Sequence, residues 1–181
     1  MAVQPILKMG HPNLRIQATD YPLDQLGSDA FNTLIADMRD TLKDAGGIGL
    51  AAPQIDVPFN LVIIEIPEGN SRYGTLSAFG FTVLINPRIE VLDATTAGFW
   101  EGCLSIPGLR GYVERPQSIN VCYTNDQGKT IEVQFSGFPA TVVQHELDHL
   151  QGRLYIDHVK DPALMSFEAC LLYTSPSPRD S

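Results

Sequence analysis

The stretch that decides the fold runs from residue 138 to residue 152 and reads FPATVVQHELDHLQG. Proline is favoured in the first turn of a helix and glycine just after its last turn, so Pro139 and Gly152 mark the two ends. The residues between them are apolar on more than one face of a helix: Val142, Val143, Leu147 and Leu150. The sequence therefore predicts a helix of about three turns that lies inside the fold.

This helix carries an H-E-x-x-H pattern formed by His145, Glu146 and His149. Two histidines four positions apart lie on the same face of a helix, so both imidazoles can ligate one cation. The glutamate between them then reaches the water that the cation binds. A catalytic site usually takes three protein ligands, and the third ligand must come from elsewhere in the chain.

Different classes of protein would supply different third ligands. The metzincin pattern requires a histidine where this chain has Tyr155, which excludes it. A zinc endopeptidase of the thermolysin kind would combine His145 and His149 with an acidic residue well downstream, such as Glu168. We interpret Glu168 instead as a solvated helix residue. A non-catalytic metal-binding protein would use Cys103 and close the site with a fourth protein ligand.

Three segments, in this order, resemble the signature motifs of the peptide deformylase family. They are GIGLAAPQ at residues 47–54, EGCLS at residues 101–105 and HELDH at residues 145–149. The general similarity extends from about residue 5 to about residue 160. The resemblance implies a hydrolase that removes the N-terminal formyl group from N-formylmethionyl nascent polypeptides.

The resemblance also implies a role for each motif residue. The divalent metal ion would be bound by Cys103, His145 and His149, with Glu146 as the general acid and base. The side chain of Gln54 and the backbone N–H of Leu104 would bind the formyl oxygen, and such neutral donors suit a developing oxyanion. One thiolate and two imidazoles suit zinc, iron, cobalt or nickel. The resemblance favours Fe²⁺.

Five further residues are expected to contact the substrate. Ile48, Gly49 and Val142 are expected to line a pocket for an unbranched apolar side chain such as that of methionine. We expect Arg110 at the mouth of this pocket, with Glu101 orienting it. Asp148 is expected to be either exposed or behind a metal ligand, Cys122 to lie in the core, and His11 and His158 to lie at the surface.

The remaining elements are predicted from periodicity and turn residues. An amphipathic helix is expected over residues 28–45, with Ser28 as its N-cap and Gly46 and Gly47 at its end. β-branched segments bounded by turn residues predict strands at residues 59–66, 81–86, 119–124 and 130–135, the last two forming a hairpin. We therefore expect an α+β fold with antiparallel sheets around the central helix.

One catalytic domain is expected over residues 1–172, ending in a helix at about residues 162–172 that Asp161 would cap. Residues 173–181 are rich in Ser and Pro and are predicted to be a disordered tail, or a cloning remnant. Family members often continue into a basic segment that helps docking on the ribosome. The apolar and then Ser/Pro-rich end of this chain gives that contact little support.

Composition excludes several classes of protein. The chain has 181 residues, of which 12 are Lys or Arg and 21 Asp or Glu, so its net charge of −9 argues against nucleic-acid binding. No apolar run approaches the ~20 residues that span a membrane, and no signal peptide is apparent. Three widely spaced cysteines fit a reducing compartment. We expect a monomer in the cytoplasm, with an organellar or viral origin as the alternative.

Overall fold

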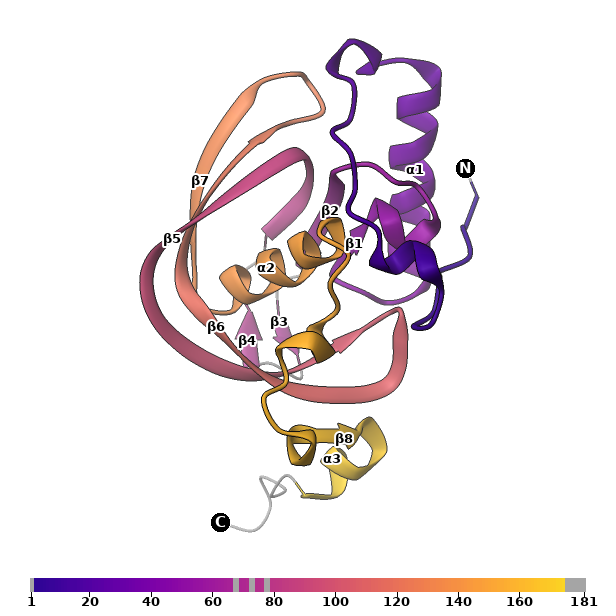
Figure 1. The fold of residues 1–181 in the computed structure, drawn as a ribbon. Coiled ribbons are helices and arrows are strands. Elements are labelled where there is room, and N and C mark those ends of the chain that lie inside the picture. Colours follow the sequence, from indigo (N-terminus) through magenta and orange to yellow (C-terminus); the bar gives the residue numbers. More distant parts are fainter. Residues whose placement is uncertain (1, 67–68, 72–73, 77–78, 175–181) are drawn as a thin grey trace.

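The central helix of the fold is α2 (Phe138–Leu150), as the sequence predicts. In the computed structural model, which describes residues 2–66, 69–71, 74–76 and 79–174, the strands surround this helix. Figure 1 shows β5, β6 and β7 curving around one side of it, with β1 and β2 on the other side. Ten of its 13 residues are buried, which explains why apolar side chains occur on more than one face.

Six of the described strands form one antiparallel sheet in the order β1-β2-β5-β6-β7, with β8 paired to β6. Their bounds are Gly49–Ala51 (β1), Leu61–Ile66 (β2), Phe79–Cys103 (β5), Ile106–Thr124 (β6), Thr130–Ser136 (β7) and Met165–Phe167 (β8). Two short strands, β3 (Gly69–Ser71) and β4 (Gly74–Leu76), pair separately. The expected α+β fold with antiparallel sheets around a helix is confirmed.

The long β5–β6 hairpin brings distant parts of the chain to the centre of the molecule. Its ladder extends from Ile85 opposite Thr124 to Cys103 opposite Ile106, so that only two residues form the turn. The predicted strand at residues 81–86 is therefore the beginning of a strand of 25 residues. The predicted hairpin is confirmed by the register of β6 and β7 between Ser118 and Thr124.

Strand β2 divides the apolar core into two parts because its side chains point alternately to opposite faces. Val62 and Ile64 pack toward α2, whereas Leu61 and Ile63 pack toward α1 (Asp29–Asp44). Helix α1 begins where it was predicted, since the Oγ of Ser28 accepts a hydrogen bond from the backbone of Phe31 at 3.2 Å. A strand buried on both faces has no alternating pattern, which explains its continuous apolar sequence.

The predicted helix at residues 162–172 is wrong in its first half. Asp161 caps a single 3-10 turn at Pro162–Leu164, β8 follows, and helix α3 (Glu168–Thr174) comes only then. The reason is a tertiary contact, because residues 165–167 pair with residues 109–111 of β6. Helix α3 includes residues 173 and 174 of the predicted tail, and residues 175–181 lie outside the described part of the chain.

Four other 3-10 helices connect the larger elements: Pro12–Arg15, Leu23–Gln25, Ala52–Ile55 and Tyr155–His158. The prediction that Cys122 lies in the core is wrong. Its neighbours Val121 and Tyr123 are buried, and alternation along β6 places Cys122 on the exposed face.

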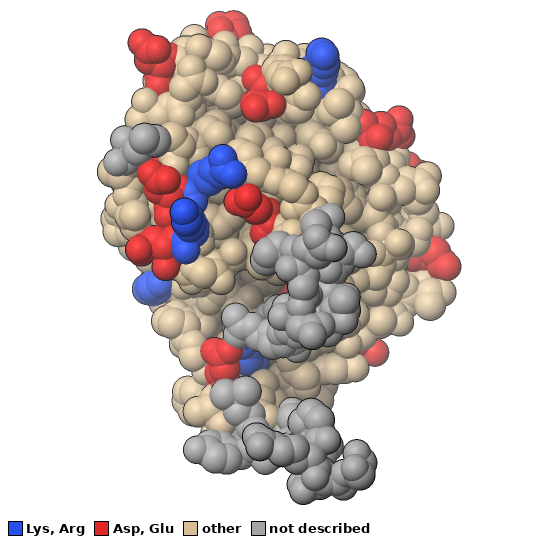
Figure 2. All heavy atoms as spheres, turned by 180° about the vertical axis from the view of Figure 1, so that it is seen from behind, with Lys and Arg blue, Asp and Glu red and all other residues tan. Residues whose placement is uncertain are grey.

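The surface agrees with the charge of the chain. On the face shown in Figure 2, acidic side chains are scattered and the few basic ones lie mostly beside acidic ones. No described helix has both the length and the apolar content that crossing a membrane requires.

Candidate metal centre

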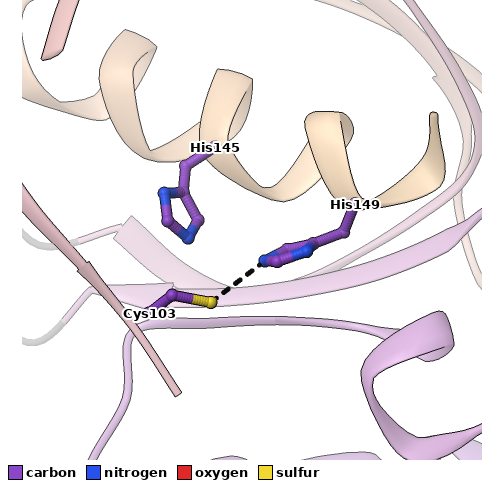
Figure 3. Close-up of side chains that lie close together, drawn as sticks. All are labelled: Cys103, His145 and His149. Carbon is purple, nitrogen blue, oxygen red and sulfur yellow. Dashed lines mark hydrogen bonds between the residues drawn. The ribbon is translucent and has the colours of Figure 1, made fainter. Parts of the chain in front are cut away.

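Three side chains with metal-binding atoms meet beside the central helix. His145 and His149 extend from successive turns of α2 toward Cys103, the last residue of β5 (Figure 3). One ligand atom from each residue lies within 4.8 Å of the others, and the Sγ of Cys103 lies 3.3 Å from the Nε2 of His149. The helix supplies two groups at fixed spacing, and the tight β5–β6 turn supplies the third.

A carboxylate fixes the orientation of His145. The Nδ1 of His145 lies 2.8 Å from the Oε2 of Glu101, which leaves its Nε2 for the cluster. Glu101 in turn accepts two hydrogen bonds from Arg115, at 2.6 and 3.0 Å, and Arg115 donates a third to Asp148 at 2.7 Å. Such a partner behind an imidazole is typical of metal sites, since it sets the tautomer and the ring direction.

The structure corrects the expected role of Glu101. Glu101 bonds to Arg115 and His145 and does not orient Arg110. Arg110 instead donates to Glu168 at 2.6 Å. Glu168 is the first residue of α3, is 39% exposed as expected of a solvated helix residue, and pairs with Arg110 on the cavity wall; it is not a member of the cluster.

Asp148 lies behind the cluster, which is one of the two expected placements. Its side chain is 15% exposed and contacts both Arg115 and His158, whose Nε2 lies 2.9 Å away. His158 is one-third exposed and His11 is exposed, so both are surface residues as expected.

The cluster stabilises a thiolate. Burial by itself raises the pKa of the Cys103 thiol, but the positive charge of His149 and a hydrogen bond from His145 outweigh it and hold that pKa well below its usual value. For His145, burial favours the neutral ring, yet Cys103 and Glu101 raise its pKa well above the ordinary value. These shifts favour the thiolate of Cys103, which is the form of cysteine that binds a metal ion.

Glu146 is buried beside the cluster and has an unpaired oxygen. Its residue is 5% exposed, and its Oε2 has no hydrogen-bond partner among the described residues. Burial raises its pKa. A Cβ added to Gly49 would lie only 2.6 Å from the Cδ of Glu146, so glycine at this position of β1 leaves the room that the carboxylate occupies.

Gln54 is held with its amide NH₂ toward Cys103. Its Oε1 accepts from the backbone N–H of Ala51 at 2.9 Å. Its Nε2 donates to the Oγ of Ser105 at 3.1 Å and lies 3.5 Å from the Sγ of Cys103. The sequence did not single out Ser105, although its place two residues after Cys103 in the turn determines this contact.

A cavity of about 690 Å³ opens beside the cluster. Ten of the eleven expected site residues line it: Ile48, Gly49, Gln54, Glu101, Cys103, Leu104, Arg110, Val142, His145 and Glu146. Phe99 and Phe138, which no sequence pattern marked, pack their rings edge to face in its wall. Arg115 and Tyr155 were not marked either, and the ring of Tyr155 stacks on that of His145 with centroids 6.1 Å apart.

The residues fit a divalent metal ion. The cluster offers one soft sulfur and two imidazole nitrogens, a set that binds zinc or iron at about 2.0–2.3 Å. The orphaned Oε2 of Glu146 is a buried acceptor in need of a donor, as a group beside a metal-activated water would be. A helix-borne H-E-x-x-H set, a third ligand outside the helix and an open cavity define a metal-dependent hydrolase.

Comparison with known proteins identifies the family. The family model described as polypeptide deformylase matches residues 3–164. The peptide deformylase of Leptospira biflexa is 41% identical over 167 residues, covering 92% of this chain and 93% of that protein. Peptide deformylase 2 of Pseudomonas syringae pv. tomato is 46% identical over 165 residues, covering 91% and 92% of the two chains.

Solved structures agree. A class I type b peptide deformylase from Acinetobacter baumannii, determined with Met-Ala-Ser bound, superposes with a TM-score of 0.82 at 35% identity, covering 87% of this chain and 99% of that one. The peptide deformylase of Thermotoga maritima superposes with a TM-score of 0.77 at 31% identity, covering 89% and 100%. The chain belongs to the polypeptide deformylase family, whose members are metal-dependent hydrolases that remove the N-terminal formyl group of nascent peptides.

Proposed function

We propose that this chain deformylates N-formylmethionyl peptides with a divalent ion held by Cys103, His145 and His149. The observation that carries the proposal is the convergence of these three side chains, within 4.8 Å, on a cavity that also contains the buried carboxylate of Glu146. Family membership supplies the reaction, and the geometry supports a role for each residue.

When bound, the ion acts as a Lewis acid and lowers the pKa of a coordinated water toward neutrality. Glu146 accepts the proton of the attacking water and passes it to the amine that leaves as the formyl C–N bond breaks. The Nε2 of Gln54 and the backbone N–H of Leu104 donate hydrogen bonds to the formyl oxygen, which becomes negatively charged during attack. The contact of Gln54 with Ala51 supports this role, because it keeps the donor end of the amide toward Cys103.

The side chain of the formylated methionine occupies the apolar part of the cavity. Ile48 and Val142 line this part together with the rings of Phe99 and Phe138. An unbranched thioether adapts to such a wall more easily than a β-branched side chain does. Gly49 leaves space for Glu146, and Arg110 lies farther along the wall.

We propose Fe²⁺ as the natural ion, with Zn²⁺, Ni²⁺ and Co²⁺ able to replace it, because a thiolate with two imidazoles accepts all four. The chain is proposed to work as a monomer in the cytoplasm on peptides that leave the ribosome.

One assay separates this function from the two alternatives. Purified chain is offered formyl-Met-Ala-Ser, its unformylated form and casein. Release of formate from the first peptide alone supports the proposal. Cleavage of casein would indicate a zinc endopeptidase, and turnover of none of the three with a full complement of metal would indicate a non-catalytic metal protein. Metal analysis of the Glu168→Ala variant completes the test. The variant should keep its ion, because Glu168 is a metal ligand only in the zinc endopeptidase alternative.

The Glu146→Gln variant tests the proposed acid and base. Glutamine keeps the size of the side chain but cannot accept the proton, so kcat should fall by on the order of 10² or more while the metal content stays stoichiometric. Loss of the ion would make Glu146 a ligand, and full activity would assign the proton transfer to another group.

A further inference from the structure

A segment near the start of the chain, residues 4–9, passes beside the metal centre, and we call it the N-terminal strap. The backbone N–H of Leu7 donates to the carbonyl of Gln54 at 2.8 Å, and the backbone N–H of Met9 donates to the carbonyl of Ser105 at 2.8 Å. The first residue of the strap is bonded to a threonine of α1 through its backbone N–H, also at 2.8 Å. The strap therefore connects helix α1 to the segments on both sides of the cluster.

The side chain of Lys8 makes a further contact between the strap and the site. Its Nζ donates to the carbonyl of Leu104 at 2.9 Å. Ile6 and Leu104 are partly buried against the same part of the core, and all three residues line the cavity. A hydrogen bond from a charged donor is roughly twice as strong as one between neutral groups. Lys8 is thus a charged anchor for the tight turn between β5 and β6.

The carbonyl that Lys8 contacts belongs to a peptide group whose other end faces the metal centre. This group joins Leu104 to Ser105, and because it is planar and trans, its C=O and N–H point in opposite directions. The C=O points to Lys8, and the N–H of Ser105 donates to the Sγ of Cys103 at 3.4 Å. A positive charge at the oxygen polarises the group and makes its N–H a stronger donor. The charge of Lys8 therefore acts on the sulfur through one peptide group.

Two hydrogen-bond donors approach the Sγ of Cys103 from segments that the strap holds. They are the backbone N–H of Ser105, at 3.4 Å, and the Nε2 of Gln54, at 3.5 Å. The strap accordingly contacts the carbonyls of both residues. The donor of Ser105 shares its peptide group with the contact of Lys8, whereas the amide of Gln54 is held by Ala51. A change at Lys8 should therefore act on the Ser105 donor and leave the Gln54 donor in place.

We infer that Lys8 is a positioning residue of the metal centre. It holds the peptide group between Leu104 and Ser105 so that the N–H of Ser105 donates to the sulfur of Cys103, and it thereby reduces the electron donation of that sulfur to a bound ion. The inference rests on the proposed function, because it requires Cys103 to be a ligand of the ion. Hydrogen bonds to a ligating sulfur are one of the means by which a protein adjusts the properties of a metal centre.

The test compares the wild type and Lys8→Met after each is loaded with Co²⁺. The quantity measured is the position of the near-ultraviolet absorption band in which a thiolate transfers charge to the ion. A hydrogen bond lowers the energy of the sulfur lone pairs, so a weaker bond brings this band to longer wavelength. Lys8→Met should show such a shift, larger than the difference between replicate preparations, and Lys8→Arg should keep the band of the wild type because it keeps the charged donor.

A matched control is Lys129→Met, which removes another exposed lysine of the same charge, just before β7 and outside the cavity wall. Its band should coincide with that of the wild type. Circular dichroism of the variants checks the fold, since a purely structural role of Lys8 would lower stability without moving the band.

Two results would overturn the inference while the proposed function stands. One is a thiolate band at the same wavelength in the wild type and Lys8→Met, and the other is an equal shift in Lys129→Met, which would indicate a general charge effect. The same wild-type samples are offered formyl-Met-Ala-Ser. Absence of a thiolate band in the Co²⁺-loaded wild type, or of any release of formate, would count against the proposed function itself and overturn the inference with it.

Discussion

Replacing Arg115 by methionine should destabilise the protein strongly, because the buried carboxylate of Glu101 loses two hydrogen bonds and the largely buried carboxylate of Asp148 loses one. The side chains of Arg115 and Glu101 are 5% and 6% exposed, and two hydrogen bonds of 2.6 and 3.0 Å join them. Asp148, which is 15% exposed, loses its 2.7 Å bond at the same time. Removing one partner of such a pair typically costs about 3–5 kcal/mol of unfolding free energy. We expect Arg115→Met to fall in this range.

Two further variants define the origin of that loss. Arg115→Lys keeps the charge but cannot form the two parallel bonds to Glu101, so it should recover only part of the stability. The double variant Arg115→Met/Glu101→Gln removes both charges and should cost less than the sum of the two single variants. Arg88→Met is the matched control, because Arg88 pairs with Asp20 where the side chains are 62% and 54% exposed. It should cost about 1 kcal/mol or less.

The measurement is urea unfolding followed by circular dichroism, with linear extrapolation of the unfolding free energy. It is made with saturating Ni²⁺ and again after chelation, because an ion that binds only the folded state adds to its apparent stability. A loss below about 1 kcal/mol for Arg115→Met in both conditions would refute the reasoning, since exposed pairs cost that little.

Three other predictions concern single positions. Gly49→Ala should lower kcat at least ten-fold with the metal retained, because the new Cβ would lie 2.6 Å from the Cδ of Glu146; unchanged turnover would contradict the packing argument. Cys103→Ala should purify without stoichiometric metal. The wild type loaded with Fe²⁺ should lose activity in air faster than the wild type loaded with Zn²⁺ or Ni²⁺, because a thiolate beside a redox-active ion is prone to oxidation. Equal lifetimes for the three metal forms would count against Cys103 as a ligand of the ion. Burial raises the pKa of Asp157, but the hydrogen bond from Arg15 outweighs it and leaves the pKa below 3.8. Asp157 therefore stabilises the fold above pH 3.8, and the stability lost in Asp157→Asn should disappear as the pH falls through the lowered pKa; a loss that persists in acid would show that the charge is not responsible.

The helical parts of the site could be predicted because their geometry is local. The spacing of His145 and His149 places both rings on one helix face whatever surrounds the helix. The cap of Ser28 and the apolar periodicity after it likewise determine α1 without reference to the sheet. Cys103 could not be joined to the histidines by spacing, and the resemblance to a known family supplied that ligand.

The parts that were missed depend on pairing between distant segments. Beyond residue 86, β5 mixes polar, apolar and glycine residues, and its ladder with β6 makes it a strand. Residues 165–167 pair with β6 although they lie in a segment with helical signals. No local pattern marks Arg115, and its burial against Glu101 depends on contacts between segments that are distant in the sequence. Tertiary contacts thus overrode local preference at these positions.

The ion pair of Arg115 and Glu101 is better explained by orientation than by stability. Apolar residues of similar volume usually stabilise a core at least as well as a buried ion pair does. In this pair, however, the Oε2 of Glu101 lies 2.8 Å from the Nδ1 of His145. This contact determines which ring nitrogen of His145 faces Cys103. With one imidazole oriented by the pair and Cys103 placed by the β5–β6 turn, the three ligand atoms lie within 4.8 Å of one another. The fold therefore keeps this buried ion pair where the direction of a ring determines the chemistry.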